Sequence, residues 1–293
     1  MSAVVVNPQQ GSASRPRGGG VLALGRRPAL VLGITSLLGL VAFTWPLLVQ
    51  PSGTVSSAHA SDAPWLMALL VPLLLMVVLA EVSDGSLDAK GVAVLGVLAA
   101  CGAALRLPRG GTAGFEPVFF LLFPAGRVLG KGFGFVLGAV TLFASALLTG
   151  GIGPWLPFQM LAAAWLGFGA GCLPNGPRWQ RRRAEVFLLA AYAAVASLVY
   201  GLLLDLWFWP FGSDGTSVGF VAGAPFWENL RRFWAFHLST AMAFDLGRAV
   251  TSVALVLVCG APVVAALHRV AKRASFGAPV TIGADDPAEV APG

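Results

Sequence analysis

Charged residues are scarce in this sequence. Only 11% of its 293 residues are Asp, Glu, Lys or Arg, whereas soluble domains carry roughly 25%. A chain with so little charge cannot cover an ordinary water-facing surface, which excludes a soluble globular protein. Apolar residues make up 57% of the chain, and this share excludes an intrinsically disordered protein. The composition therefore indicates a protein whose outer surface faces lipid.

Motifs of enzymes and cofactor sites are also missing. His59, His237 and His268 and the three cysteines show no metal-ligand spacing, so neither a metal site nor a disulfide framework is predicted. The sequence GRVLGKG at 126–132 lacks the spacing and the Ser or Thr of a phosphate-binding loop. The sequence GTSVG at 215–219 lies in a loop between apolar segments, not at the strand–turn–helix elbow that a hydrolase needs. We predict no catalytic residue and no cofactor, and any ATP used must be hydrolysed by another chain.

Long apolar segments are what the sequence has instead. A helix needs about 20 apolar residues to cross a hydrocarbon core about 30 Å thick. We therefore predict an all-α integral membrane protein in the lipid bilayer. Its eight predicted transmembrane segments are 28–49, 64–81, 89–106, 117–129, 132–149, 157–173, 185–209 and 237–267.

The basic residues predict how these segments are oriented. With eight spans and a cytoplasmic N-terminus, 14 of the 19 Lys and Arg residues fall in cytoplasmic segments and 4 in outer loops. This asymmetry follows the positive-inside rule and predicts a multi-pass protein of the cell membrane with both termini cytoplasmic. Joining 117–129 to 132–149 as one kinked span would move the N-terminal arginines outside, so separate spans are favoured. The basic residues form short clusters, not one stripe, which argues against nucleic-acid binding.

The two termini, residues 28–60 and the loop 210–236 each have a composition that predicts a separate role. Residues 1–27 and 274–293 are too rich in Gly, Pro and other small residues to bury a core and are predicted to be disordered. Residues 28–60 also resemble a signal peptide, so cleavage there stays open as an alternative to a retained first helix. The aromatic-rich outer loop 210–236 is predicted to be either a lid over a site or an amphipathic segment at the membrane interface.

Three ionisable residues lie well inside predicted spans. Asp205, Asp245 and Arg248 each cost several kcal/mol in the membrane unless they are paired or hydrated, so each is a candidate functional residue. Asp245 and Arg248 are three positions apart on one helix and are predicted to meet. An internal ion pair and a direct substrate contact both stay open.

Aromatic residues gather at the predicted outer ends of the spans. Trp155 and Phe158 stand beside Gln159, and Trp207 and Trp209 close a later span. An interfacial belt and the wall of a pocket for a flat, partly polar ligand are both consistent with this placement. The candidate substrate-binding residues are Trp155, Phe158, Gln159, Asp205, Trp207, Trp209, His237, Asp245 and Arg248.

Small residues recur at helical spacing. Gly130, Gly134 and Gly138 line one helix face, as do Gly167 and Gly171, and we expect backbones to approach closely there. A second small-residue face is predicted to pack inside the bundle or to dock a partner helix. It consists of Ala99, Ala100, Ala103 and Ala104.

Several of these segments resemble one transporter family. The segments are residues 117–171, 200–211 and 244–273, and GPWLPFQM at 153–160 is the most specific part. Together they resemble the substrate-binding (S) components of energy-coupling factor (ECF) transporters, as found in actinobacteria. The resemblance covers residues 87–273 and implies a six-helix core, preceded in this chain by two additional transmembrane helices within 28–86.

The resemblance implies a function without chemistry. S components bind a vitamin from outside and act with a transmembrane coupling (T) subunit and two cytoplasmic ATPases, and the small-residue face at Ala99–Ala104 matches the one that docks the T subunit. The GPWLPFQM segment is similar to components assigned to cobalamin, with riboflavin or another vitamin as alternatives. A membrane-embedded lipid or isoprenoid enzyme and an autonomous permease are the other classes considered.

Overall fold

The computed structural model of this chain describes residues 25–48, 76, 89–107, 114–177, 179, 181–213 and 215–274. Within these residues every regular element is helical and no strand occurs, which confirms the all-α class. The predicted segment 64–81 lies outside the described residues apart from Met76, as do nearly all of 1–27 and 274–293. The arrangement of eight spans and the division into domains therefore stay predictions.

The described helices follow the predicted apolar segments. Each of the other seven predicted segments coincides with helical structure whose ends differ by a few residues. The loop 210–236 adds one helix that was not predicted, and a short π-helical segment, η2, joins it to the last helix. The elements are α1 (Arg26–Leu48), α4 (Ala89–Ala104), η1 (Pro117–Phe119), α5 (Leu122–Leu129), α6 (Lys131–Thr149), α7 (Leu156–Gly171), α8 (Arg182–Gly212), α9 (Phe226–Phe236), η2 (His237–Ala241) and α10 (Met242–Ala274).

The predicted segments 117–129 and 132–149 are two helices, as the charge pattern indicated. Between α5 and α6, Gly130 has a φ of 115°, a conformation that favours glycine. A Cβ on Gly134 would lie only 2.9 Å from the Cα of Gly126, so α6 folds back along α5. One kinked span is therefore ruled out for this part of the chain.

Glycines bring α5, α6 and α7 into backbone contact. A Cβ on Gly134 would lie 2.2 Å from the carbonyl oxygen of Gly167, and one on Gly167 would lie 2.0 Å from that of Gly134. A Cβ on Gly138 would lie 2.3 Å from the carbonyl oxygen of Ala163. Any larger side chain here would force the helices apart, which confirms the close approach predicted from the glycine spacing.

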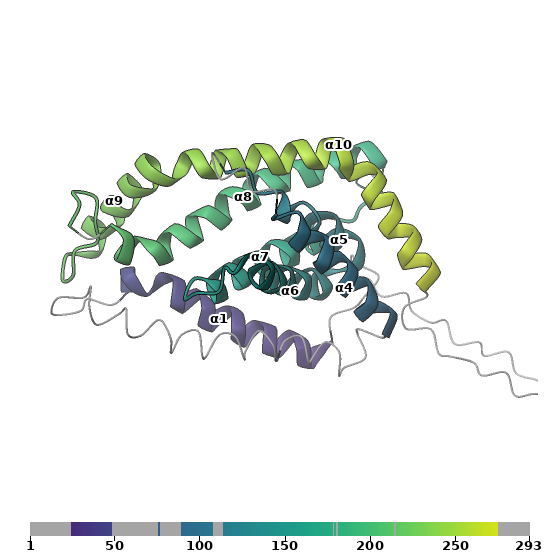
Figure 1. Ribbon diagram of the computed structural model, residues 1–293, viewed down its shortest axis with the longest axis horizontal. Helices are drawn as coiled ribbons and strands as arrows, with labels where there is room; N and C mark the ends of the chain where they lie inside the picture. The colour runs from purple at the N-terminus through teal and green to yellow at the C-terminus, as the bar shows by residue number, and fades with distance from the viewer. Residues whose placement is uncertain are drawn as a thin grey trace, which may run out of the picture.

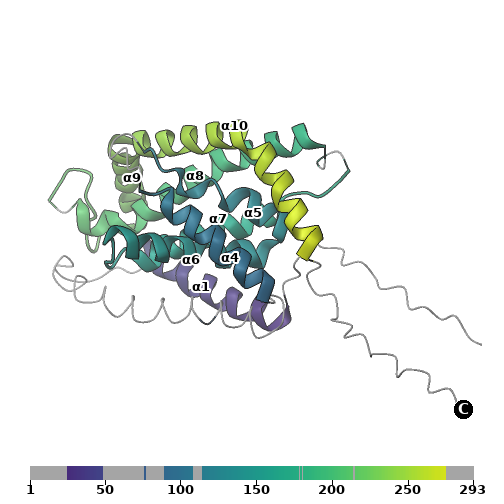
Figure 2. The same cartoon turned by 45° about the vertical axis from the view of Figure 1, so that its right-hand side comes forward.

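Helices α1, α8 and most of α10 run along the long axis of the molecule, α4 lies obliquely to them, and the helix ends gather in two places (Figures 1 and 2). One end holds the starts of α1 and α4, the α5–α6 and α7–α8 junctions, and the end of α10. We call it the basic end, because Arg26, Lys90, Lys131 and Arg182 lie at the starts of α1, α4, α6 and α8. The opposite end carries α9 and is called the α9 end. This segregation agrees with the predicted topology, while the side facing the cytoplasm stays a prediction.

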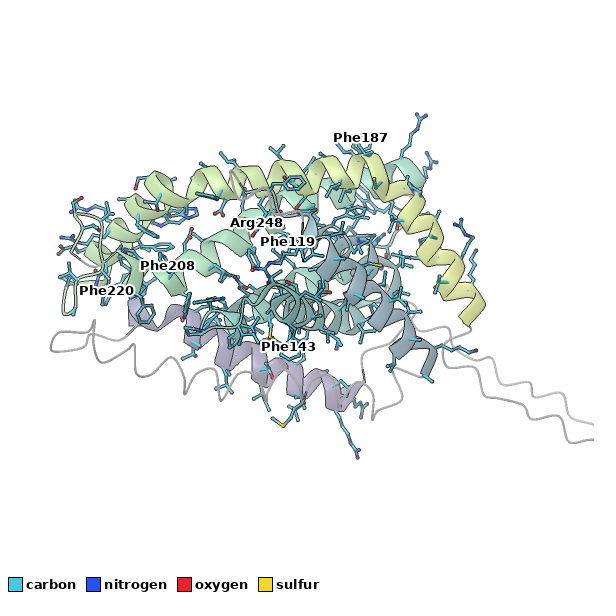
Figure 3. The ribbon with its side chains drawn as sticks, in the orientation of Figure 1. Phe119, Phe143, Phe187, Phe208, Phe220 and Arg248 are labelled. Atoms are coloured by element: carbon cyan, nitrogen blue, oxygen red, sulfur yellow. The ribbon has the colours of Figure 1, made fainter. Side chains whose placement is uncertain are left out.

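The outer surface of the bundle is apolar. Four helical stretches are long and apolar enough to cross a membrane: 26–44, 131–149, 183–212 and 226–272. Large hydrophobic side chains on them point outward, among them Phe187 on α8 and Phe143 on α6 (Figure 3). A surface of this kind is stable in lipid and would aggregate in water.

Helix α1 is part of the bundle and packs on α7. The Trp165 indole donates a hydrogen bond to the Ser36 hydroxyl at 2.9 Å. The ring of Phe43 is fully buried against Phe158 and Trp165, with centroid distances of 5.1 and 5.7 Å. Within the described residues, the first additional helix therefore contributes to the same core as the later helices.

Candidate functional site

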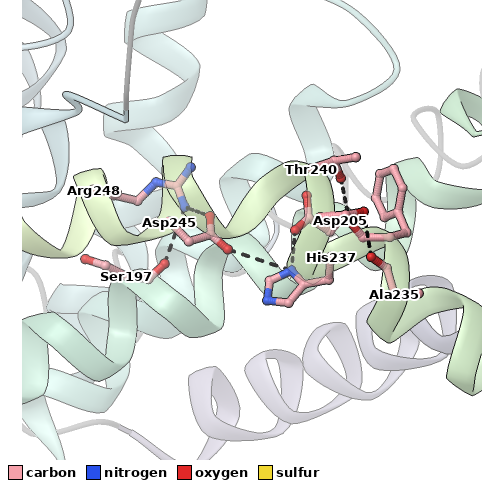
Figure 4. Close-up of polar contacts among 9 residues, drawn as sticks. Ser197, Asp205, Ala235, His237, Thr240, Asp245 and Arg248 are labelled. Carbon is pink, nitrogen blue, oxygen red and sulfur yellow. Dashed lines mark hydrogen bonds and ion pairs between the residues drawn. The ribbon is translucent and has the colours of Figure 1, made fainter. Parts of the chain in front are cut away.

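A chain of ionisable side chains links α10 to its neighbours toward the α9 end (Figure 4). Arg248 donates to Glu116, which precedes η1, and to the Asp245 carboxylate at 2.6 Å. The second carboxylate oxygen of Asp245 lies 3.9 Å from Nδ1 of His237, and that nitrogen lies 2.7 Å from Asp205 on α8. We call Glu116, Arg248, Asp245, His237 and Asp205 the polar chain.

The predicted meeting of Asp245 and Arg248 is confirmed, and Arg248 has further partners. Its guanidinium lies 5.1 Å from the centroid of the Tyr200 ring and donates to the carbonyl oxygen of Ser197. Tyr200 in turn packs on Phe119, which lies near Arg248 (Figure 3). A buried charge is tolerated when paired and hydrogen-bonded in this way, so Arg248 has a structural role whatever else it does.

His237 is positioned by an irregular turn. It is the first residue of η2, where the helix widens from α to π geometry between α9 and α10. The hydroxyls of Ser239 and Thr240 donate to the carbonyl oxygens of Ala235 and Phe236, two acceptors of this turn (Figure 4). Short π segments are frequent at functional sites, because they redirect a side chain without ending the helix. Here the turn directs His237 toward Asp205.

A second cluster of polar side chains lies just after the C-terminal end of α4. Arg106 donates to the Ser145 hydroxyl at 3.1 Å and to the Gln159 side-chain oxygen at 3.4 Å. Gln159 is half-buried beside Phe158, at the start of α7. Arg106 was not among the predicted site residues, because its partners come from α6 and α7 and are distant in the chain.

The predicted aromatic residues belong to different surroundings. Phe158 and Trp207 are buried and pack together with ring centroids 5.2 Å apart, and Phe158 also packs on Phe43 of α1. Trp155 is exposed at the α6–α7 corner, where its indole donates to the Gly151 carbonyl oxygen. Trp209 is completely buried and donates to the Val218 carbonyl oxygen at 2.8 Å. The structure thus brings together only Phe158 and Trp207 of the four predicted aromatic residues.

The loop 210–236 is tied down by aromatic packing. Rings of Phe220 and Phe233 each lie 5.4 Å from Trp209, which joins this loop to the end of α8. On the opposite face of α9, Trp227 is 75% exposed. The helix therefore has one face on the protein and one face turned outward that carries Trp227, Trp234 and Arg231. The two alternatives, lid and interfacial segment, stay predictions.

The four alanines of α4 divide into two faces. Ala99 and Ala103 are buried and face α6, where Gly102 approaches Thr141 so closely that a Cβ would lie 2.7 Å from its methyl carbon. Ala100 and Ala104 are exposed. Of the four, Ala100 and Ala104 are therefore the pair that the described part of the chain leaves accessible to a partner helix.

Comparison with known proteins identifies one family. No curated protein and no solved structure gave a significant match. The family described as "ECF transporter, substrate-specific component" matches residues 90–260, which is more than half of the chain. This range runs from the start of α4 through most of α10 and contains the whole polar chain. Proteins of this family are membrane transport proteins, not enzymes, and act with a coupling T subunit and ATPases. The chain belongs to the substrate-specific components of ECF transporters.

Proposed function

We propose that this chain captures a vitamin at its α9 end, which faces the outside of the cell. The family match carries the transport function. The observation that supports the position of the site is the contact between Asp205 and His237. Trp207 follows Asp205 by two residues on α8 and packs on Phe158. Pockets for small molecules combine apolar walls with a few oriented polar groups, and this end of the bundle offers both.

The proposed contacts follow from what the residues already do. Trp207 and Phe158 supply the apolar wall, and Asp205, His237 and Gln159 supply polar contacts. Trp155, Asp245 and Arg248 are retained as predicted contacts, with Asp245 and Arg248 already engaged in the polar chain. Trp209 acts indirectly in this proposal, because its buried indole holds the loop that adjoins the site.

Cobalamin is the favoured vitamin, with riboflavin or another vitamin as alternatives. The support is the resemblance of GPWLPFQM at 153–160 to cobalamin components of actinobacterial type. A corrinoid is large, and the loop between α8 and α9 is long enough to contact a ligand of that size.

We further propose that α4 docks the coupling T subunit, which works with two cytoplasmic ATPases. Ala100 and Ala104 are exposed and lie on one face of α4 with Cys101 and the exposed Val97. Small residues allow a partner helix to approach closely in a membrane. Ala99 and Ala103 would act indirectly, by seating α4 on α6.

Mass spectrometry of small molecules that copurify with the full-length protein tests the ligand directly. Added cobalamin should quench tryptophan fluorescence, and Trp207→Leu should weaken that binding about tenfold or more, because one wall of the site is lost. Trp227→Leu is the matched control, since Trp227 faces outward on α9 and its loss should leave affinity unchanged. Equal effects of both substitutions would contradict the proposed wall.

Uptake in cells tests the division of labour. A cell that expresses this chain together with a T subunit and ATPases should accumulate the vitamin, and removal of the ATPases should abolish accumulation. Ala100→Leu should reduce uptake without reducing binding, whereas the buried control Ala99→Leu should destabilise the protein itself. Uptake that persists without the ATPases would identify an autonomous permease instead.

A further inference from the structure

Three potential metal ligands converge near the α9 end. Asp205 on α8, His237 on η2 and Asp245 on α10 each offer one ligand atom, and these atoms all lie within 4.8 Å of one another. We propose that Asp205, His237 and Asp245 form a binding site for a divalent transition-metal ion such as Zn²⁺. The site shares these three residues with the proposed vitamin contacts, but it does not rest on vitamin binding, because zinc binding is tested without the vitamin.

An unsatisfied buried oxygen points to a ligand. Asp245 is 2% exposed, and its Oδ2 atom has no hydrogen-bond partner. The other oxygen, Oδ1, is held by Arg248 at 2.6 Å, which leaves Oδ2 on the side of the His237 ring. A buried acceptor without a partner costs about 1–3 kcal/mol, and more when it is charged. A cation between Oδ2 and the imidazole would satisfy this oxygen.

The distances fit small side-chain adjustments around a metal ion. Zinc binds His nitrogen and carboxylate oxygen at about 2.0–2.2 Å in a tetrahedron, which places neighbouring ligand atoms about 3.4 Å apart. Nδ1 of His237 lies 2.7 Å from Asp205 and 3.9 Å from Asp245, so one distance is shorter and the other longer than this value. Changes of about half an ångström to one ångström in side-chain position would make both fit.

The charge of the polar chain favours a divalent cation. It contains three carboxylates, those of Glu116, Asp205 and Asp245, and one guanidinium, that of Arg248. With a neutral imidazole the polar chain carries a net charge of −2, which a divalent ion balances. A protonated His237 would balance only one of these charges. Imidazole nitrogen suits zinc, copper, iron and nickel, whereas magnesium and calcium prefer oxygen alone.

Position and surroundings also suit an ion that enters from the α9 end. The Asp205 side chain is 17% exposed and is the most open of the three, whereas those of His237 and Asp245 are almost completely buried. Rings of Phe233 and Trp234 on α9 pack against the His237 ring and restrict its orientation. A bound ion would join α8 to the start of α10 and thereby hold α9 in place. Three protein ligands leave one coordination position open.

Metal titration of the purified full-length chain tests the proposal. The protein, free of any histidine tag, is reconstituted in nanodiscs, stripped with a chelator and titrated with Zn²⁺ alone by calorimetry. We expect one ion per chain and a rise of several degrees in Tm at saturating zinc, since a ligand that binds only the folded state stabilises it. Mg²⁺ should produce neither effect. His237→Ala and Asp205→Asn should each weaken zinc binding at least 100-fold.

Matched controls keep the outcome clear. His268→Ala removes another histidine, which lies 3.9 Å from the buried carboxylate of Glu185. Among the described residues it belongs to no group of three potential metal ligands, so zinc affinity should not change. Asp205→Asn is the safer variant for folding, because its side chain is the most exposed of the three. Zinc binding that survives both His237→Ala and Asp205→Asn, or no zinc binding at all, overturns the proposal. The zinc titrations contain no vitamin, and vitamin binding is measured separately and without metal, so the failure of either proposal can be told from the failure of the other.

Discussion

Two buried ionic clusters lie toward opposite ends of this bundle and differ in how fully they are satisfied. Toward the basic end, Arg127 donates to Glu185 at 3.2 Å and to the carbonyl oxygen of Leu173 at 2.9 Å. His268 adds a weaker contact from the surface of α10. Toward the α9 end, the polar chain has excess carboxylate and one buried oxygen without a partner. In the first cluster the charged groups are paired within the protein, whereas the second cluster retains a carboxylate oxygen that could bind a ligand.

The comparison also separates stability from function. Arg127 and Glu185 join α5 to α8 in a part of the bundle where the proposed ligand does not bind. Apolar residues of similar volume could be as stabilising at this position, and the buried charges of Arg127 and Glu185 are tolerated because they are paired. The polar chain keeps its unsatisfied oxygen although this lowers stability, and such local conflicts are typical of functional sites.

Breaking the Arg127 pair should have the largest effect on stability. Arg127→Met leaves Glu185 buried without its guanidinium, and removing one partner of a buried pair costs about 3–5 kcal/mol. We expect a fall in Tm of about 10 °C in detergent, measured by size-exclusion after heating. The double variant Arg127→Met/Glu185→Gln should recover much of this loss. Equal Tm values for the single and double variants would show that the lone charge is not the cause.

The equivalent change in the polar chain should act mainly on binding. Asp245→Asn combined with Arg248→Met removes both charges together, and the remaining Glu116 side chain is 35% exposed and can be hydrated. Vitamin affinity should fall about tenfold, which is about 1.4 kcal/mol, while the protein still elutes as a folded monomer. Fluorescence titration measures the affinity. Unchanged affinity would give the pair a purely structural role.

A substitution at Trp209 should distinguish residues that hold the loop beside the site from residues that contact the vitamin. Trp209→Phe keeps most of the ring packing but loses the hydrogen bond to Val218, which is worth about 1 kcal/mol. We expect increased hydrogen exchange in residues 215–225 with little change in vitamin affinity, in contrast to the loss predicted for Trp207→Leu. A large loss of affinity without any change in exchange would place Trp209 in direct contact with the ligand.

Substitution of the two described histidines should change Tm to different extents, and the change at His268 should be the smallest of those predicted here. The His268 side chain is 49% exposed, and ion pairs at the surface contribute about 0–1 kcal/mol, so His268→Gln should lower Tm by about 2 °C or less. His237→Gln replaces a buried ring that contacts Asp205 and two aromatic residues, and its effect on Tm should be clearly larger. Thermal scans of both variants in one detergent compare them directly.

Much of the fold was predictable because membrane helices follow a simple physical rule. Each span must satisfy its own backbone hydrogen bonds and present apolar side chains to lipid, so length and hydropathy locate it. Gly134, Gly138 and Gly167 were correctly predicted to bring helices together, since a missing Cβ has the same meaning in any helix pair. Helix α9 was anticipated only as one alternative, an amphipathic segment within the loop 210–236, because its charged residues lower its mean hydropathy below that of a membrane span.

The candidate site was predictable only in part. Asp245 and Arg248 are neighbours on one helix, so local spacing was sufficient to pair them. Glu116 lies 132 positions before Arg248, and Gln159 lies 53 positions after Arg106, so helical periodicity gives no information on either contact. The prediction of no metal site rested on the spacing of histidines and cysteines along the chain, and such spacing gives no information on carboxylates that other helices bring close. The division of the alanines of α4 into buried and exposed pairs depended on which neighbour covers the helix.

By itself, the sequence determined that this protein is a bundle of membrane helices with its basic residues toward one end. Scarcity of charge and the thickness of a bilayer leave no other stable arrangement for such a chain. Only the tertiary structure decided which polar groups meet. Asp205, His237 and Asp245 come from α8, η2 and α10, and their contact requires those elements to be packed side by side at a π-helical turn. Packing between distant helices sets such contacts, and no local pattern in the chain encodes them.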